Sequence, residues 1–132
     1  MKKLSQDALI KVRDILRQLV DEAANVDAGV IATSDGLCVV ASDSEKEKTE
    51  KLAAMASSLC ALGEAVVVEV SQGECLSVTV EADNTKIFVL RLTQAPALTL
   101  MLVSNKTALV GEIVYAARRY SEKIREVFDL ES

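Results

Sequence analysis

The sequence contains no histidine and no tryptophan, and it holds only one proline and five glycines among 132 residues. Without histidine, a Ser-His-Asp triad, a Cys-His pair, histidine-ligated zinc and imidazole acid-base chemistry are all excluded. The scattered glycines match neither the phosphate-binding pattern Gly-x-x-x-x-Gly-Lys-Ser/Thr nor the dinucleotide pattern Gly-x-Gly-x-x-Gly. We therefore expect no cofactor, no metal and no intrinsic catalysis.

Positive charge is also scarce, since 15 Lys and Arg face 20 Asp and Glu and give a net charge of -5. This balance repels phosphate backbones, so nucleic acid is not an expected partner. No uninterrupted apolar run approaches the roughly 20 residues that cross a bilayer, and the N-terminal residues do not lead into the apolar core of a signal peptide. We expect a cytoplasmic protein without a membrane span.

Three cysteines, Cys38, Cys60 and Cys75, form an odd set without a Cys-x-x-Cys pair. Each has apolar neighbours, which is typical of small buried side chains in a reducing compartment. The alternative is a reactive or metal-binding thiol, and the sequence alone leaves it open.

The length and the 50% share of hydrophobic residues are those of one domain with one core. No repeat, low-complexity tract or linker divides the chain, so we expect a single domain over residues 1–132.

Apolar side chains spaced three and four apart predict an amphipathic helix over residues 4–22, which Ser5 or Asp7 would cap. The same spacing predicts a final helix near the C-terminus, capped by Ser104 or Asn105.

Short runs rich in β-branched residues predict five strands, and a turn containing Gly36 joins the first two as a hairpin. The predicted strands span residues 28–33, 37–41, 75–81, 86–92 and 97–103.

A long helix is predicted for residues 48–71, although Val66, Val67 and Val68 alone would favour a strand. The helical repeat of apolar side chains continues through these valines without a break. The face expected to meet the core consists of Leu52, Met55, Ala56, Leu59, Leu62, Gly63, Val66, Val67 and Val70. The opposite face consists of Ala54, Ser57, Ser58, Ala61, Ala65 and Val68.

This opposite face is small and almost uncharged, whereas a solvated helix face normally carries Lys and Glu. It is therefore expected to meet a partner helix or a partner protein, because small residues allow close approach. The alternative is an alanine-rich face that serves only helix propensity.

The predicted strand over residues 75–81 is poor in charge, and at a sheet edge it would offer its backbone groups to another chain. Two copies would pair there through a two-fold axis, with the helices that begin near Lys48 side by side. The predicted dimer interface consists of Cys75, Leu76, Ser77, Val78, Thr79 and Val80.

Several short motifs occur within this element order. Residues 29–41 read Gly-Val-Ile-Ala-Thr-Ser-Asp-Gly-Leu-Cys-Val-Val-Ala, which is an apolar strand, an Asp-Gly turn and a second apolar strand. Leu-Gly-Glu occupies residues 62–64, and Gln-Gly-Glu occupies residues 72–74. By their order and spacing, the chain resembles the Roadblock/LC7 family over nearly its whole length. It is most similar to the bacterial members, which are proposed regulators of Ras-like small GTPases.

The resemblance implies an α/β fold of layered, profilin-like type, in the order α-β-β-α-β-β-β-α, with a five-stranded, mostly antiparallel sheet. It also implies a homodimer with a shared sheet, no intrinsic catalysis, and binding of a Ras-like small GTPase, whose hydrolysis some relatives accelerate. By the same resemblance, the joining strand is supported by Leu76, Val78 and Val80. The implied partner-binding platform consists of Ala54, Ser57, Ser58, Ala61 and Ala65.

Two other functions stay open at this point. The first is a scaffold subunit of a larger assembly, with no dependence on a nucleotide state. The second is a small-molecule sensor domain, because related layers of sheet and helix can enclose ligands. An enzyme ranks last, since no nucleophile and base can be named.

Overall fold

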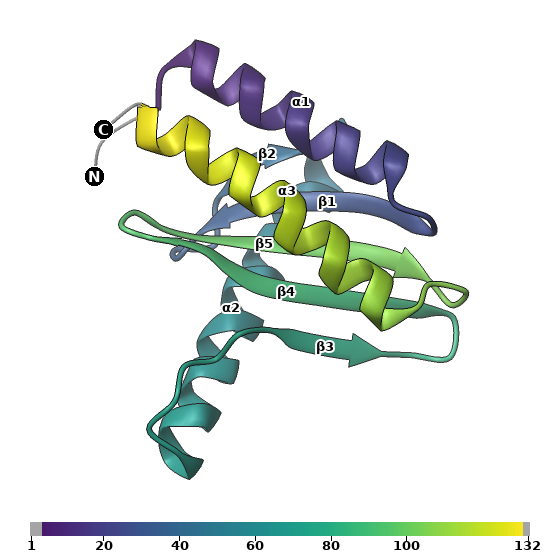
Figure 1. The fold of residues 1–132 in the computed structure, drawn as a ribbon, viewed down its shortest axis with the longest axis vertical. Coiled ribbons are helices and arrows are strands. Elements are labelled where there is room, and N and C mark those ends of the chain that lie inside the picture. The colour runs from purple at the N-terminus through teal and green to yellow at the C-terminus, as the bar shows by residue number, and fades with distance from the viewer. Residues whose placement is uncertain (1–3, 131–132) are drawn as a thin grey trace.

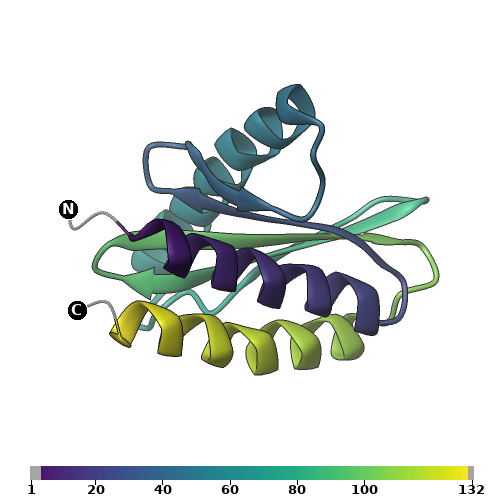
Figure 2. The ribbon, with the colours of Figure 1, turned by 90° about the horizontal axis from the view of Figure 1, so that it is seen from above.

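The structure of this protein is a computed structural model that describes residues 4–130. Its elements are α1 (Gln6–Glu22), β1 (Val26–Thr33), β2 (Cys38–Ala41), α2 (Lys46–Val70), β3 (Val78–Glu81), β4 (Thr85–Gln94), β5 (Ala97–Asn105) and α3 (Val110–Leu130). The strands form one sheet in the order β2-β1-β5-β4-β3, and every neighbouring pair is antiparallel. Helices α1 and α3 lie side by side on one face of the sheet, and α2 crosses the other face (Figures 1 and 2). The predicted α/β fold and element order are confirmed.

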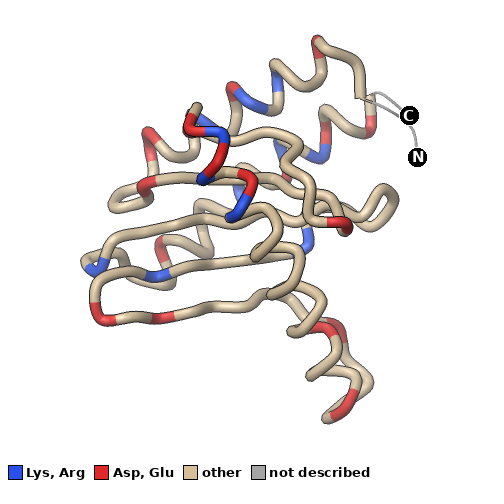
Figure 3. The backbone as a smooth tube through the Cα atoms, turned by 180° about the vertical axis from the view of Figure 1, so that it is seen from behind, with Lys and Arg blue, Asp and Glu red and all other residues tan. Residues whose placement is uncertain are grey.

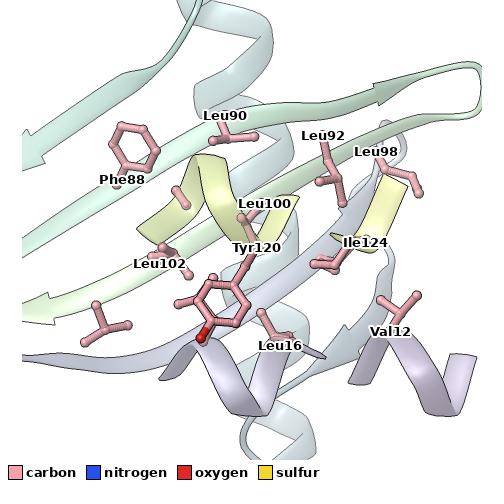
Figure 4. Close-up of a cluster of buried hydrophobic side chains, with 14 of the residues drawn as sticks. Val12, Leu16, Phe88, Leu90, Leu92, Leu98, Leu100, Leu102, Tyr120 and Ile124 are labelled. Atoms are coloured by element: carbon pink, nitrogen blue, oxygen red, sulfur yellow. The ribbon is translucent and has the colours of Figure 1, made fainter. Parts of the chain in front are cut away.

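The main core lies between the sheet and the pair α1 and α3. Alternate residues of β4 and β5 point toward these helices, where Val12 and Leu16 of α1 and Tyr120 and Ile124 of α3 meet them (Figure 4). The strand residues in this layer are Phe88, Leu90, Leu92, Leu98, Leu100 and Leu102. Each such buried side chain contributes about 1.5–3 kcal/mol, so this layer supplies most of the apolar stabilisation.

The layer beneath α2 is built from smaller side chains. The helix buries Thr49, Ala53, Ala56 and Cys60 against the sheet. These short side chains bring the helix axis close to the strands but remove little apolar surface from water.

The capping predictions had different outcomes at the two helices. Ser5 is the N-cap of α1, and its Oγ accepts a hydrogen bond from the Ala8 amide at 3.1 Å. The prediction that Ser104 or Asn105 caps the last helix is wrong, because pairing with β1 and β4 carries β5 through Asn105. The Asn105 side chain instead accepts from the Thr107 amide at 2.9 Å, in the turn that precedes α3.

Helix α2 continues unbroken through its valines, as predicted, but its predicted core-facing side is only partly correct. Ala56 is buried, and Leu52 and Leu59 pack against the core. Met55, Leu62, Val66 and Val70 were expected in the core and are exposed. The buried side is rotated around the helix toward Ala53 and the other small residues. An apolar stripe identifies a helix face that is suited to burial. It does not show that residues of the same chain cover this face.

Strand β3 is shorter than predicted, because residues 75–77 lie outside it. It pairs with β4 alone and is therefore an edge strand. The chain passes very close to α2 before it joins the sheet at Val78. A Cβ atom on Gly63 would lie 2.5 Å from Val78 Cγ2 and 3.1 Å from Cys75 Sγ.

This close passage makes Gly63 sensitive to one added methyl group. Gly63→Ala is expected to lower the free energy of unfolding by about 1–2 kcal/mol, because overpacking outweighs the better helix propensity of alanine. Urea unfolding followed by circular dichroism measures the change. The matched control is Gly111→Ala in α3, where a Cβ would have nothing within 4 Å. That control is expected to stabilise the protein by up to about 1 kcal/mol. Stabilisation by both changes would contradict the close contact at Gly63.

Candidate functional site

The outward face of α2 exposes large apolar side chains. Met55 is 56% exposed, Leu62 62% and Val66 53%, whereas the residues that the helix buries are small. Single exposed apolar residues are common on protein surfaces, but a contiguous set indicates an interaction surface.

This apolar surface continues beyond the sheet. The last turns of α2 extend past β3, where no strand lies beneath them (Figure 1). Val68 and Val70 on these turns are exposed, and so are Leu76 and Val80 near the sheet edge. The candidate site therefore joins the outward face of α2 to the free edge of β3.

Charge is distributed unevenly along α2. No charged residue occurs between Lys51 and Glu64, while Lys and Glu are mixed before this segment and only Glu follows it within the helix. The uncharged segment and the acidic end are visible in Figure 3. A partner would therefore meet an apolar centre flanked by charge.

The β1-β2 hairpin anchors the N-terminal half of α2. Ser57 Oγ donates a hydrogen bond of 2.6 Å to the Ser34 carbonyl oxygen. Gly36 has a φ of 86°, a conformation that favours glycine, and a Cβ there would lie 3.2 Å from Ala54 Cα. The turn therefore packs directly against the helix.

The five predicted platform residues lie in two environments. Ala54, Ser58, Ala61 and Ala65 are exposed on the outward side of α2. Ser57 is half-buried and engaged with the hairpin.

The predicted interface residues also fall into two groups. Val78, Thr79 and Val80 belong to β3, where Val78 is half-buried and the other two are exposed. The remaining residues, Cys75, Leu76 and Ser77, lie in the segment that leads into this strand.

An ion pair that the sequence analysis did not identify holds the C-terminal half of α2 to the sheet. Glu64 Oε1 accepts from Arg91 Nη2 at 2.8 Å and from Arg91 Nε at 3.1 Å. The Arg91 side chain is only 15% exposed, and its Nη1 also donates to Thr99 Oγ1 at 3.5 Å. The available sequence signal was Arg91, the one charged residue in the apolar run 87–92 of β4. A buried guanidinium requires a carboxylate partner, so this residue indicates an ion pair.

The thiols on this side of the sheet are shielded. Cys60 is buried, and its Sγ donates to Glu64 Oε1 at 3.5 Å. Burial raises the pKa of Cys60 and also that of Cys38, which disfavours the reactive thiolate. Within residues 4–130, no cluster of three or more His, Cys, Asp or Glu side chains could hold a metal ion.

A separate open pocket of about 500 Å³ lies between the end of α1 and the start of α3. Ala and Tyr side chains line much of it, together with Glu22, Glu112 and Arg119. The Tyr120 hydroxyl donates to Glu22 at one wall of the pocket. Because α1 and α3 cover the other face of the sheet, this pocket is distinct from the α2 surface.

Helix α2 is long and apolar enough to cross a membrane by length and composition alone. Its most apolar 18-residue window has a mean hydropathy of 1.6, and 17% of that window is buried. This is weak grounds for a span, because in the structure the helix lies on the sheet and the Glu64–Arg91 ion pair fixes it there. A membrane span is therefore not supported.

One antiparallel sheet with two helices on one face and one on the other is a profilin-like α/β fold. Profilin IA from Acanthamoeba castellanii has a TM-score of 0.54 with this chain at 10% identity, covering 85% of this chain and 94% of that one. The family model of the Roadblock/LC7 domain matches residues 13–103. The chain belongs to the Roadblock/LC7 family.

Solved bacterial structures are similar over nearly the whole chain. A Roadblock/LC7 domain from Streptomyces avermitilis has a TM-score of 0.82 at 21% identity, covering 88% of this chain and 96% of that one. MglB from Myxococcus xanthus has a TM-score of 0.83 at 12% identity, covering 98% and 95%. An MglB structure described as having a tetrameric arrangement has a TM-score of 0.81 at 14% identity, covering 94% and 92%. No curated protein matches the sequence.

The ion pair predicts a local effect of Glu64→Gln. The change is expected to lower the free energy of unfolding by about 1 kcal/mol, because it weakens a charged hydrogen bond to a mostly buried guanidinium. Amide hydrogen exchange should become faster mainly in residues 60–70. The control is Glu50→Gln, an exposed carboxylate on the same helix without an ion pair in the described chain. Unchanged exchange in residues 60–70 would show that the ion pair does not hold this part of α2.

Proposed function

We propose that this protein is a homodimeric interaction module that binds and regulates a Ras-like small GTPase in the cytoplasm, without catalysis of its own. The observation that carries the proposal is the set of large apolar side chains that α2 exposes, among them Met55, Leu62 and Val66, while its fully buried residues are small. The class of partner comes from the resemblance to bacterial Roadblock/LC7 proteins and is supported by the structural likeness to MglB.

The free edge of β3 supports self-association. This strand pairs with β4 on one side only, so the backbone groups on its other side are available to a second copy. Two-fold pairing of β3 would bring together both α2 helices, which extend past this edge. The tetrameric arrangement named for one MglB structure shows that a protein of this fold assembles from several copies.

The outward face of α2 is suited to docking rather than to chemistry. Ala54, Ala61 and Ala65 are exposed and small, so a partner's backbone can approach them closely. The uncharged segment between Lys51 and Glu64 offers no arginine to a bound nucleotide. An effect on hydrolysis would therefore arise by ordering the GTPase's own switch segments.

Self-association is tested at Leu62. Leu62→Glu is expected to weaken the dimer by about tenfold or more, because it places an unpaired charge in an apolar interface. Sedimentation equilibrium measures the dissociation constant. The matched control is Leu109→Glu, since Leu109 is also 62% exposed but precedes α3 on the other side of the sheet. Equal dissociation constants for the two variants would contradict an interface on α2.

GTPase binding is tested with candidate Ras-like GTPases from the same cell. This protein is expected to bind at least one of these GTPases more tightly in its GTP-loaded form than in its GDP-loaded form. Adding this protein should also change the rate at which that GTPase hydrolyses GTP. Ala61→Arg should reduce binding by about tenfold, because the long side chain blocks close approach. The proposal fails if no candidate binds or changes rate, and equal binding of both nucleotide states would identify a scaffold instead.

A further inference from the structure

The pocket between the end of α1 and the start of α3 is a part of the molecule that the proposed function does not use. Helix α1 ends at Glu22, and the chain continues toward β1 through Ala23 and Ala24, whose methyl groups fill little of the space beside α3. Gly111 also lines the pocket, and a Cβ there would have nothing within 4 Å. Small residues therefore keep open a space of about 500 Å³, which is a size typical of small-molecule sites.

One row of side chains on α3 lines this pocket with three different chemistries. Glu112, Tyr115 and Arg119 follow one another at spacings of three and four residues, which places them in line on one side of the helix. Tyr115 is 67% exposed and lies between the negative residue and the positive one. The row therefore offers a carboxylate, an aromatic ring and a guanidinium, in that order, to an occupant of the pocket.

The two charges of this row have no partners of opposite sign. Glu112 and Arg119 are both exposed, and neither forms an ion pair within residues 4–130. They are seven residues apart, which corresponds to about 10 Å along the helix axis, so the fold holds them apart from each other. The third charge at the pocket is already engaged, because Glu22 accepts hydrogen bonds from the Tyr120 hydroxyl and from Gln18 Nε2.

The aromatic ring beneath the pocket helps to position its positive group. The Arg119 Cζ atom lies 5.9 Å from the centroid of the Tyr120 ring, within the range of a cation-π contact. Tyr120 itself is buried and fixed by its hydrogen bond to Glu22. The guanidinium is thus partly ordered before a ligand arrives, which lowers the entropic cost of binding.

We propose that this pocket binds a small zwitterion with an ammonium group at one end, an apolar middle and a carboxylate at the other end. The ammonium group pairs with Glu112, the apolar middle lies against the Tyr115 ring, and the carboxylate pairs with Arg119. Charges at opposite ends of the ligand match these residues better than charges on one carbon atom, because the residues are two helical turns apart. An ω-amino acid has this chemistry.

Ligands with fewer charges match the pocket less well. An amine without a carboxylate would leave Arg119 beside a like charge, and a carboxylate without an amine would do the same at Glu112. An apolar ligand would remove water from both charged groups without replacing their hydrogen bonds. A zwitterion is the class of small molecule that satisfies both ends of the row.

This site lies apart from the surface on which the proposed function depends. Helices α1 and α3 cover the face of the sheet opposite α2 (Figure 2). A bound zwitterion would cover neither the outward face of α2 nor the free edge of β3. The inference therefore goes beyond the proposed function, and the failure of either one leaves the other standing.

The chain carries its own probe of this pocket. It has no tryptophan, and both of its tyrosines line the pocket, so tyrosine emission reports on this site. Titration with ε-aminocaproate at low salt is expected to change this emission with a dissociation constant of about 1 mM, since the site is open to water. Hexylamine and caproate each lack one charge, and L-norleucine is an isomer of the probe with both charges at one end. These three compounds should bind about fivefold more weakly or less.

Removal of either charge tests the two contacts. Glu112→Gln and Arg119→Gln are each expected to weaken the binding of ε-aminocaproate by about fivefold, because each removes one ion pair with the ligand. Both side chains are exposed, so the fold should persist, and circular dichroism checks this. The matched controls are Glu122→Gln and Arg118→Gln, exposed residues of α3 outside the pocket, which should leave binding unchanged.

Three results would overturn the proposal. The first is the absence of any change in tyrosine emission and in the amide chemical shifts of residues 110–120 during the titration. The second is binding of hexylamine, caproate or L-norleucine as tightly as ε-aminocaproate. The third is an unchanged dissociation constant in the variants of Glu112 and Arg119. None of these measurements involves a GTPase or a second copy of the chain, so they do not test the proposed function.

Discussion

The close contact between α2 and the sheet is the constraint on which the rest of this molecule depends. It is made by short side chains, among them Ala53, Ala56 and Cys60, and near β3 it depends on the missing side chain of Gly63. A helix that approaches through its small residues directs several of its large ones outward, here Met55, Leu62 and Val66. Because α2 packs on the sheet through this face, its other side exposes apolar side chains and the Cys60 thiol is buried.

The two sides of the sheet consequently have different roles. The α1 and α3 side buries large side chains such as Phe88, Leu100 and Ile124 and contributes most to stability. The α2 side has a thinner apolar layer, which the Glu64–Arg91 ion pair and the Ser57 contact to the hairpin supplement. Under the proposed function, stability and partner binding would lie on opposite faces, so the α2 face could carry apolar residues that a free surface would not keep.

Most of the fold could be predicted from the sequence, because local periodicity determines the elements. The helical repeat continues through the valines of α2 and so predicts a helix there, and the side-chain oxygen of Ser5 makes it one of two candidate caps for α1. The start of α3 was not predictable in this way, since pairing across the sheet extends β5 to Asn105. The candidate site was predicted only in part. Ala61 and Ala65 lie on the outward face as expected. Met55 and Leu62 are exposed although the periodicity places them toward the core, because an apolar repeat does not show which side of a helix the sheet covers.

The antiparallel arrangement of α1 and α3 has a practical consequence. Gln6 begins α1 and Leu130 ends α3, and these two ends are neighbours on the face that α2 does not occupy (Figure 2). A fluorescent label or an additional domain joined at either end would be held behind the sheet. Such fusions would leave the helix that faces outward unobstructed, and the family fold is in this respect well suited to modular attachment.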